Sequence, residues 1–310
     1  MHMSPESPEI ETLARILRAG GLVAFPTETV YGLGADATSS DAVLRIYETK
    51  GRPRFNPLIV HVADLEMARR YVEFSPLALQ LAGFWPGPLT LVLPRRPEAG
   101  LSDIVTAGLD TVGIRVPAHP LAQALIRAAD RPIAAPSANR SGKLSPTTAA
   151  QVIANFGDSV PVLDGGAATA GVESTILAVD GETVTQLRAG ALPREEIESL
   201  LGRPVAVAEA NAAISAPGML ASHYAPDAHL RLDASAPEPG EAYLGFGPGP
   251  ATPYTLSATG DLREAARNLF SMLHNMDRTH RRIAVAPIPT TGLGEAINDR
   301  LRRAAAPRDR

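Results

Sequence analysis

The chain of 310 residues contains no cysteine, and only two of its 29 basic residues, Lys50 and Lys143, are lysines. The absence of cysteine excludes disulfides, thiolate nucleophiles and cysteine-ligated zinc sites. Apolar runs fall short of the ~18 residues needed to cross a bilayer. Residues 1–11 show neither the basic nor the hydrophobic region of a secretory signal. We therefore expect a cytoplasmic protein that does not interact with membranes.

Common catalytic and nucleotide-binding signatures are also missing. The sequence has no G-x-x-x-x-G-K-S/T loop, which excludes nucleoside triphosphate binding through a P-loop. It has no G-x-S-x-G turn, which weakens an α/β-hydrolase interpretation. Its seven histidines are scattered without an H-E-x-x-H pair, so a dedicated transition-metal site is not expected. The formal net charge of −4 argues against a generally basic surface for nucleic acid.

The chain does contain enough apolar material, 45% of its residues, for about two packed domains. Residues 8–19 have the apolar spacing of a helix, with Ser7 as its cap, and residues 22–25 predict a short buried strand. Asp180 and Gly181 indicate a hairpin between strands at 176–179 and 184–187. Strands alternating with helices predict an α/β sheet with some antiparallel pairing. Further strands are expected over residues 58–62, 90–93, 112–116, 133–135 and 160–163, and helices over 41–49, 120–129 and 147–155.

The amino-acid composition of the chain changes near residue 206. Residues 206–226 are rich in Ala, Pro, Ser and Gly without a clear period, which is typical of a linker or an ordered crossing segment. A smaller α/β unit follows, with an amphipathic helix over 262–273 that Asp261 can cap. We therefore divide the chain into residues 1–205, 206–226 and 227–310. The strands of the last unit are expected over residues 229–232, 242–246 and 283–287.

The densest group of cations is formed by Lys50, Arg52 and Arg54, which fall within five positions. Gly51 and Pro53 prevent a continuous helix there, so the three cations can converge on one polyanion. Arginine offers a fork to phosphate oxygens, and lysine a point charge. A solvated turn after a helix explains the same residues about equally well.

Residues 135–147 are rich in small polar side chains and follow a short buried strand. They lie at the carboxyl end of a strand, where ligands bind in open α/β sheets, although Ser145 also resembles a helix N-cap. Arg115, Arg188 and His61 lie on or beside expected strands, where an arginine is more often exposed and a histidine more often structural. The combination indicates an anion-binding α/β enzyme, and the residue patterns alone lead no further.

Seven motifs follow one another in order: FPTETVYGLG (25–34), KGRP (50–53), NPL (56–58), WPGPLT (85–90), VGIRVP (112–117), PSAN (136–139) and GVEST (171–175). PGM and HYAP within 217–226, and GLG and NDRL within 292–301, continue the series. Together they resemble the L-threonylcarbamoyladenylate synthase family in its long, two-domain form. The resemblance implies a YrdC-like catalytic domain, with a twisted open mixed sheet and helices, followed by a smaller Rossmann-like α/β domain.

The resemblance also implies a nucleotidyltransferase reaction, in which L-threonine, bicarbonate and ATP give threonylcarbamoyl-AMP and pyrophosphate for the N6-threonylcarbamoyl modification of adenosine 37 in tRNA. Lys50 and Arg52 would be catalytic, holding the triphosphate and stabilising its charge. By family likeness the ATP site would comprise Lys50, Arg52, Asn56, Thr111, Ser137, Asn139, Ser145, Arg188 and Tyr224. The threonine site would comprise Thr29, His61, Arg115, Ala135 and Ser174, with Arg115 as the partner of the carboxylate.

Other partners follow from the same resemblance. Mg²⁺ would enter with ATP, since no acidic cluster is evident and phosphate oxygens and water suit this ion. Residues 206–226 are a candidate lid, with a passive linker as the alternative. The product would pass to a tRNA threonylcarbamoyl transferase, with weak or no direct tRNA binding. Two rival hypotheses are a module that binds double-stranded RNA through a basic concave face, and carbamoyl-adenylate chemistry on another acceptor.

Overall fold

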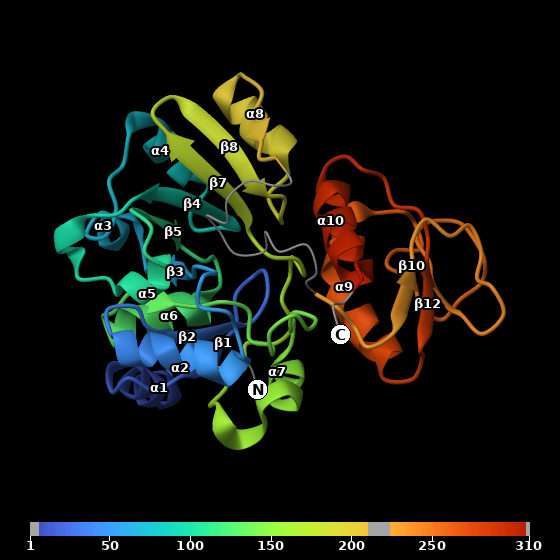
Figure 1. Ribbon diagram of the computed structural model, residues 1–310, viewed down its shortest axis with the longest axis horizontal. Coiled ribbons are helices and arrows are strands. Elements are labelled where there is room, and N and C mark those ends of the chain that lie inside the picture. Colours follow the sequence, from blue (N-terminus) through green and yellow to red (C-terminus); the bar gives the residue numbers. More distant parts are fainter. Residues whose placement is uncertain (1–5, 210–223, 308–310) are drawn as a thin grey trace.

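The computed structural model describes residues 6–209 and 224–307 (Figure 1). Residues 6–209 form a large lobe, blue to yellow in Figure 1, and residues 224–307 form a small lobe, orange to red. The strands of the large lobe are β1 (Val23–Phe25), β2 (Gly32–Asp36), β3 (Ile59–His61), β4 (Leu89–Pro94), β5 (Thr111–Arg115), β6 (Ile133–Ala134), β7 (Thr175–Asp180), β8 (Thr183–Arg188) and β9 (Ala206–Val207).

These strands form one sheet in the order β1-β2-β6-β3-β5-β4-β7-β8-β9. Three neighbouring pairs, β3 with β5, β4 with β7 and β8 with β9, are parallel, and the other pairs are antiparallel. The mixed α/β sheet is therefore confirmed, and β7 and β8 form the expected hairpin. The carboxyl ends of β3 and β5 lie side by side, where His61 pairs with Arg115 in the ladder.

Strand β2 was not expected, because its segment is rich in turn residues. Gly34 is nevertheless required for packing: a Cβ there would lie 2.8 Å from side-chain atoms of both Ile133 and Phe25. The opposite error concerns residues 160–163, which were expected as a strand and make only an isolated bridge between Val162 and Ala24. Pro161 has no N–H to donate, which prevents a longer ladder at that point.

The helices agree with the apolar spacing, apart from short ones. They are α1 (Pro8–Arg18), α2 (Ser40–Lys50), α3 (Leu65–Ala68), α4 (Pro76–Leu81), α5 (Asp103–Thr106), α6 (Pro120–Ala129), α7 (Ala149–Phe156), α8 (Arg194–Leu201), α9 (Leu262–Asp277) and α10 (Leu293–Ala305). Ser7 and Asp261 cap α1 and α9 as expected. Helix α8 escaped notice because Ile197 is its single buried residue. Among the described residues, no helix is both long and apolar enough to cross a membrane.

The small lobe has a parallel sheet in the order β10-β12-β11, built from β10 (His229–Arg231), β11 (Ala242–Leu244) and β12 (Arg282–Val285). Helices α9 and α10 pack against each other, and Figure 1 shows both between this sheet and the large lobe. The small parallel sheet with its helices confirms the smaller α/β unit expected after residue 226.

The two lobes share a buried apolar interface. Val30 and Val172 of the large lobe belong to the same buried cluster as Leu269 and Phe270 of α9. Gly171 shows how close the contact is, because a Cβ there would lie 2.3 Å from the Cα atom of Arg267 in α9. Only glycine fits at this position, which also has a φ of +77°. The lobes are thus held together by packing as tight as in a core.

The segment between the lobes begins later than the sequence indicated. Ala206 and Val207 were placed in the linker, whereas they form β9 and pair with Thr185 and Gln186 of β8. Most of the candidate lid, residues 210–223, lies outside the described residues. Tyr224 and the residues after it are described.

Candidate active site

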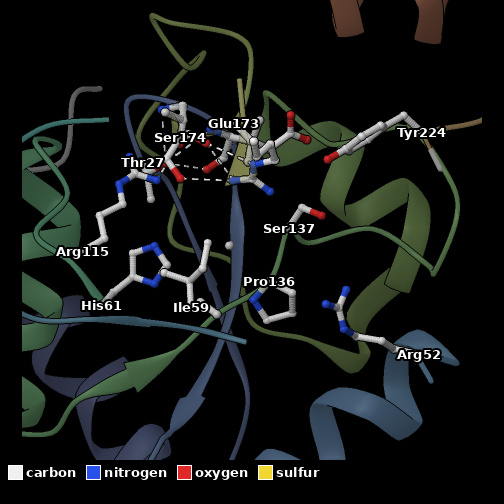
Figure 2. A pocket seen from close by; sticks show the side chains of 15 residues that line it. Thr27, Arg52, Ile59, His61, Arg115, Pro136, Ser137, Glu173, Ser174 and Tyr224 are labelled. Carbon is white, nitrogen blue, oxygen red and sulfur yellow. Dashed lines mark hydrogen bonds between the residues drawn. The ribbon is translucent and has the colours of Figure 1, made fainter. Parts of the chain in front are cut away.

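One pocket lies at the carboxyl ends of β3 and β5 and extends toward the small lobe. It encloses about 540 Å³, part of it open to solvent. Figure 2 shows Arg115 and His61 on one side, and Arg52 and Tyr224 on the other, with Ser137 and Pro136 between them. The lining residues are Thr27, Thr29, Val30, Gly32, Arg52, Ile59, His61, Arg115, Ala135, Pro136, Ser137, Glu173, Ser174, Arg188 and Tyr224.

All five residues assigned to threonine line this pocket, and four of those assigned to ATP do so. The four are Arg52, Ser137, Arg188 and Tyr224. Because these nine residues come from strands, loops and the start of the small lobe, the sequence resemblance has selected residues that the fold brings together.

Arg115 is buried at the end of β5, contrary to the ordinary expectation of an exposed strand arginine. Its Nε donates to the Gly87 carbonyl (3.1 Å), its Nη1 to Thr29 Oγ1 (3.0 Å) and its Nη2 to Glu28 Oε1 (2.6 Å). A guanidinium has five N–H donors, so two remain for a ligand. The side chain is therefore fixed in place before any anion binds.

His61 lies beside Arg115 and packs its ring edge-on to Phe25, with 5.9 Å between the ring centroids. Burial and the adjacent Arg115 charge lower the pKa of His61 to about 3. Its Nδ1 has no hydrogen-bond partner among the described residues. At neutral pH the pocket therefore contains an uncharged imidazole with an unused polar atom.

Ser174 connects three strands at the top of the pocket in Figure 2. Its hydroxyl forms a 2.8 Å hydrogen bond with Thr90 Oγ1 of β4. Arg188, at the end of β8, donates from Nε to the Ser174 carbonyl (3.1 Å) and from Nη2 to Ser174 Oγ (3.2 Å). Burial lowers the pKa of Arg188 below that of an exposed arginine. Arg188 is thus a second buried guanidinium of the pocket, held in place by Ser174.

Lys50 is the last residue of α2, which Gly51 ends with a φ of 62°. Its Nζ donates to the carbonyls of Ser137 (2.6 Å) and Asn139, so the lysine lies behind the pocket wall rather than on it. Burial, and then the charge of Arg52, hold the pKa of Lys50 well below that of an ordinary lysine. Ser137, whose carbonyl accepts from Lys50, therefore separates the lysine from the pocket.

Arg52 does line the pocket, and its Nη2 donates to the Pro57 carbonyl at 3.0 Å. Burial lowers the pKa of Arg52 to about 10. Arg54, in contrast, is exposed. The three cations therefore do not all converge: Lys50 and Arg52 turn inward and Arg54 remains in solvent.

The other predicted ATP residues lie outside the pocket lining. Asn56 and Asn139 are buried, and the Oδ1 atom of each has no partner among the described residues. Thr111 begins β5, roughly 13 Å along the strand from Arg115. Ser145 is not a helix cap, since Thr148 caps α7; its hydroxyl instead donates to Glu173 Oε1 at 2.5 Å.

The sequence interpretation missed two acidic residues of the site, Glu28 and Glu173, and one hydroxyl, Thr27. Thr27 Oγ1 donates to the Val30 carbonyl (2.7 Å) and contacts Thr29 Oγ1 (2.8 Å), which shapes the turn below Arg115. All three lie inside motifs that carried the resemblance. The signal available in the sequence was a glutamate next to hydroxyl residues inside a motif, as in Thr27-Glu28-Thr29 and Glu173-Ser174. Within the described residues, no group of three or more His, Cys, Asp or Glu side chains is placed to hold a metal ion.

Comparison with known proteins matches both lobes to family models. Residues 15–190 match a model described as "Telomere recombination", and residues 192–306 match "Threonylcarbamoyl-AMP synthase, C-terminal domain". A threonylcarbamoyl-AMP synthase of Pyrococcus abyssi is 42% identical over 97% of this chain and 95% of its own length. This chain belongs to the threonylcarbamoyl-AMP synthase family.

A solved structure and a second relative agree with this assignment. The crystal structure of P. abyssi Sua5 complexed with L-threonine superposes with a TM-score of 0.89 at 40% identity, covering 98% of this chain and 96% of that one. A Klebsiella pneumoniae threonylcarbamoyl-AMP synthase is 37% identical over 53% of this chain and 88% of its own length. The predicted family and the long, two-domain form are therefore confirmed, and the chain is an enzyme of this family.

Proposed function

We propose that this chain joins L-threonine, bicarbonate and ATP into threonylcarbamoyl-AMP and pyrophosphate. The observation that carries the proposal is that Arg115 and His61 face Arg52 and Tyr224 across one and the same pocket. Its two sides offer separate places for an amino acid and a polyphosphate, so their reactive groups meet between them. Enforced proximity of this kind supplies much of the rate enhancement when two substrates must meet.

The Arg115 side suits a small amino acid. The two unused guanidinium donors can bind a carboxylate as a fork. Thr29, Ser174 and the neutral His61 can bond the hydroxyl and amine without adding charge. The P. abyssi relative was crystallised as a complex with L-threonine, which supports threonine as the amino-acid substrate.

The chemistry needs positioning and charge stabilisation more than covalent help from the protein. The threonine amine and bicarbonate form a carbamate and release water. A carbamate oxygen then attacks the α-phosphorus of ATP, the bond from that phosphorus to the bridging oxygen breaks, and pyrophosphate leaves. Lys50 and Arg52 would stabilise the negative charge that develops on the phosphate oxygens.

Mg²⁺ would enter with ATP and neutralise its phosphates, held by phosphate oxygens and water. Removing Mg²⁺ with a chelator should stop turnover while leaving threonine binding intact.

We place the reaction in the cytoplasm and assign its product to N6-threonylcarbamoylation of adenosine 37 in tRNA by a separate transferase. The net charge of −4 supports weak or no binding of tRNA by this chain itself. We assign catalysis to residues 1–205, with residues 227–310 as the second domain and 206–226 between them.

The decisive experiment measures pyrophosphate release with each substrate omitted in turn. Release should require threonine and bicarbonate together with ATP. Release that continues without threonine would contradict the proposal, and release with another amino acid in its place would favour a different acceptor.

A further inference from the structure

A buried arginine of the small lobe reaches the pocket wall. Arg300 lies on α10 with 1% of its surface exposed, and its Nε donates to Glu173 Oε2 at 2.8 Å. Its Nη1 donates to the Ala189 carbonyl (2.9 Å) and to Asp299 Oδ2 (2.7 Å). Since Glu173 lines the pocket, a direct ion pair connects the small lobe to the site.

Glu173 lies among groups that we assign to the nucleotide. Its second oxygen, Oε1, accepts from Ser145, and the next residue, Ser174, holds Arg188 through its carbonyl. Burial would raise the pKa of Glu173, but the charges of Arg300 and Arg188 outweigh it and lower that pKa. The residue is therefore a buried carboxylate whose charge must be balanced.

Arg300 also contacts Tyr224, which lines the nucleotide side of the pocket. Its guanidinium carbon lies 5.2 Å from the ring centroid of Tyr224, and the Tyr224 and Phe270 ring centroids are 5.7 Å apart. Tyr224 is 2% exposed. Two small-lobe side chains, one cationic and one aromatic, therefore fix the ring of a pocket residue, as cation–π and aromatic pairs do.

We propose that Arg300 is a positioning residue for the nucleotide end of the pocket. It balances Glu173, so that this carboxylate neither draws Arg188 away nor repels the triphosphate, and it fixes the ring of Tyr224. This inference rests on the proposed ATP site. Its consequence is that ATP binding requires a docked small lobe, whereas threonine binding at the Arg115 side does not depend on Arg300.

The test compares ATP and threonine binding, measured separately by titration calorimetry, in wild type, Arg300→Met and Arg300→Lys. Loss of one partner of a buried pair leaves the other charge unbalanced. We expect Arg300→Met to weaken ATP binding about tenfold, as couplings between contacting residues often do, and Arg300→Lys to weaken it less. Threonine affinity should stay within about twofold, because Arg300 contacts none of the residues assigned to threonine directly and reaches Ser174 only through Glu173 and Arg188.

A double variant separates charge balance from simple docking. Glu173→Gln with Arg300→Met removes both charges, so ATP should bind more tightly than to Arg300→Met alone. Arg194→Met is the matched control, because Arg194 of α8 also pairs across the lobes, with Glu295 of α10 (3.4 Å), without lining the pocket. It should leave both affinities unchanged.

Several results would overturn the inference: unchanged ATP affinity in Arg300→Met, equal losses for both substrates, or no recovery in the double variant. If Arg300→Met fails to fold, Arg300→Lys is compared with the wild type instead: a loss confined to ATP affinity supports the inference, and unchanged ATP affinity or equal losses for both substrates overturn it. Failure of the wild type to bind ATP at all would instead refute the proposed function, and this inference with it.

Discussion

At the side of the pocket assigned to threonine, side chains hold one another, whereas at the nucleotide side backbone carbonyls hold the cations. Arg115 is fixed by Thr29 and Glu28. Lys50 and Arg52 donate instead to carbonyl oxygens of neighbouring loops. In the first arrangement, Arg115 is held in place and its charge is balanced by Glu28 before any ligand binds. In the second, the hydrogen bonds of Lys50 and Arg52 go to carbonyl oxygens and not to a carboxylate, so an anion can balance their charge.

The difference has an energetic reason. A buried cation without a countercharge is costly, and the lowered pKa values of Lys50 and Arg52 express that cost. A triphosphate at the proposed ATP site would relieve this cost on binding, so we expect affinity at this side to come from the negative charge of the ligand. At the Arg115 side the charge is already balanced by Glu28, and the ligand gains mainly from preorganised geometry.

The largest effect should come from removing the unbalanced cations. Lys50→Ala and Arg52→Ala should each reduce pyrophosphate release by about 10²–10³-fold or more, since each removes a buried positive charge that we assign to stabilising the developing charge of the phosphates. Arg54→Ala, a change in the exposed neighbour, is the matched control and should retain near wild-type rates. Equal losses in all three variants would show that the loop, rather than the two buried charges, matters.

A smaller and more selective loss is expected at the preformed side. Arg115→Lys retains a charge but not the fork, and should raise the threonine KM about 10–100-fold. The KM for ATP should change little, as steady-state kinetics with each substrate varied in turn would reveal. A parallel rise in both KM values would mean that the two sides are not independent.

His61 should make stability depend on pH. Its pKa is about 3 in the folded protein and near 6.5 when unfolded, so below pH 6.5 the unfolded chain binds the extra proton. The folded state therefore loses up to ~1.4 kcal/mol per pH unit as pH falls toward 3. In urea titrations from pH 7 to 4, His61→Asn should lose less stability than the wild type. Parallel curves would mean that His61 titrates normally.

The smallest effect on activity is expected for a substitution of Lys143, in contrast with the same substitution of Lys50. Lys143 is exposed and pairs with Asp227 at 2.6 Å, and such surface pairs contribute roughly 0–1 kcal/mol. Lys143→Arg should therefore be nearly silent in rate and melting temperature. Lys50→Arg should lose most activity, because a guanidinium does not fit between the Ser137 and Asn139 carbonyls.

Sequence patterns predicted most elements because apolar spacing reflects burial directly, as in α6 and the β7–β8 hairpin. They failed at β2, where glycines serve the packing of Phe25 against Ile133 rather than a turn. In the site, motifs identified residues that line the pocket, such as Arg52, Arg115 and Ser174. Glu28, Glu173 and Arg300 escaped notice because their importance lies in contacts over 87 and 127 positions of the chain, and no local pattern records such contacts.

The Glu173–Arg300 pair joins residues that belong to two different family models, one ending at residue 190 and the other beginning at 192. The charge of Glu173 in the first module is therefore balanced in part by a residue of the second module. A protein that has the first module but not α10 needs either a neutral residue at the position of Glu173 or another cation beside it to balance the charge. Joining or separating these modules in a gene would require a matching change at that position, so the boundary between them is a poor place for independent exchange.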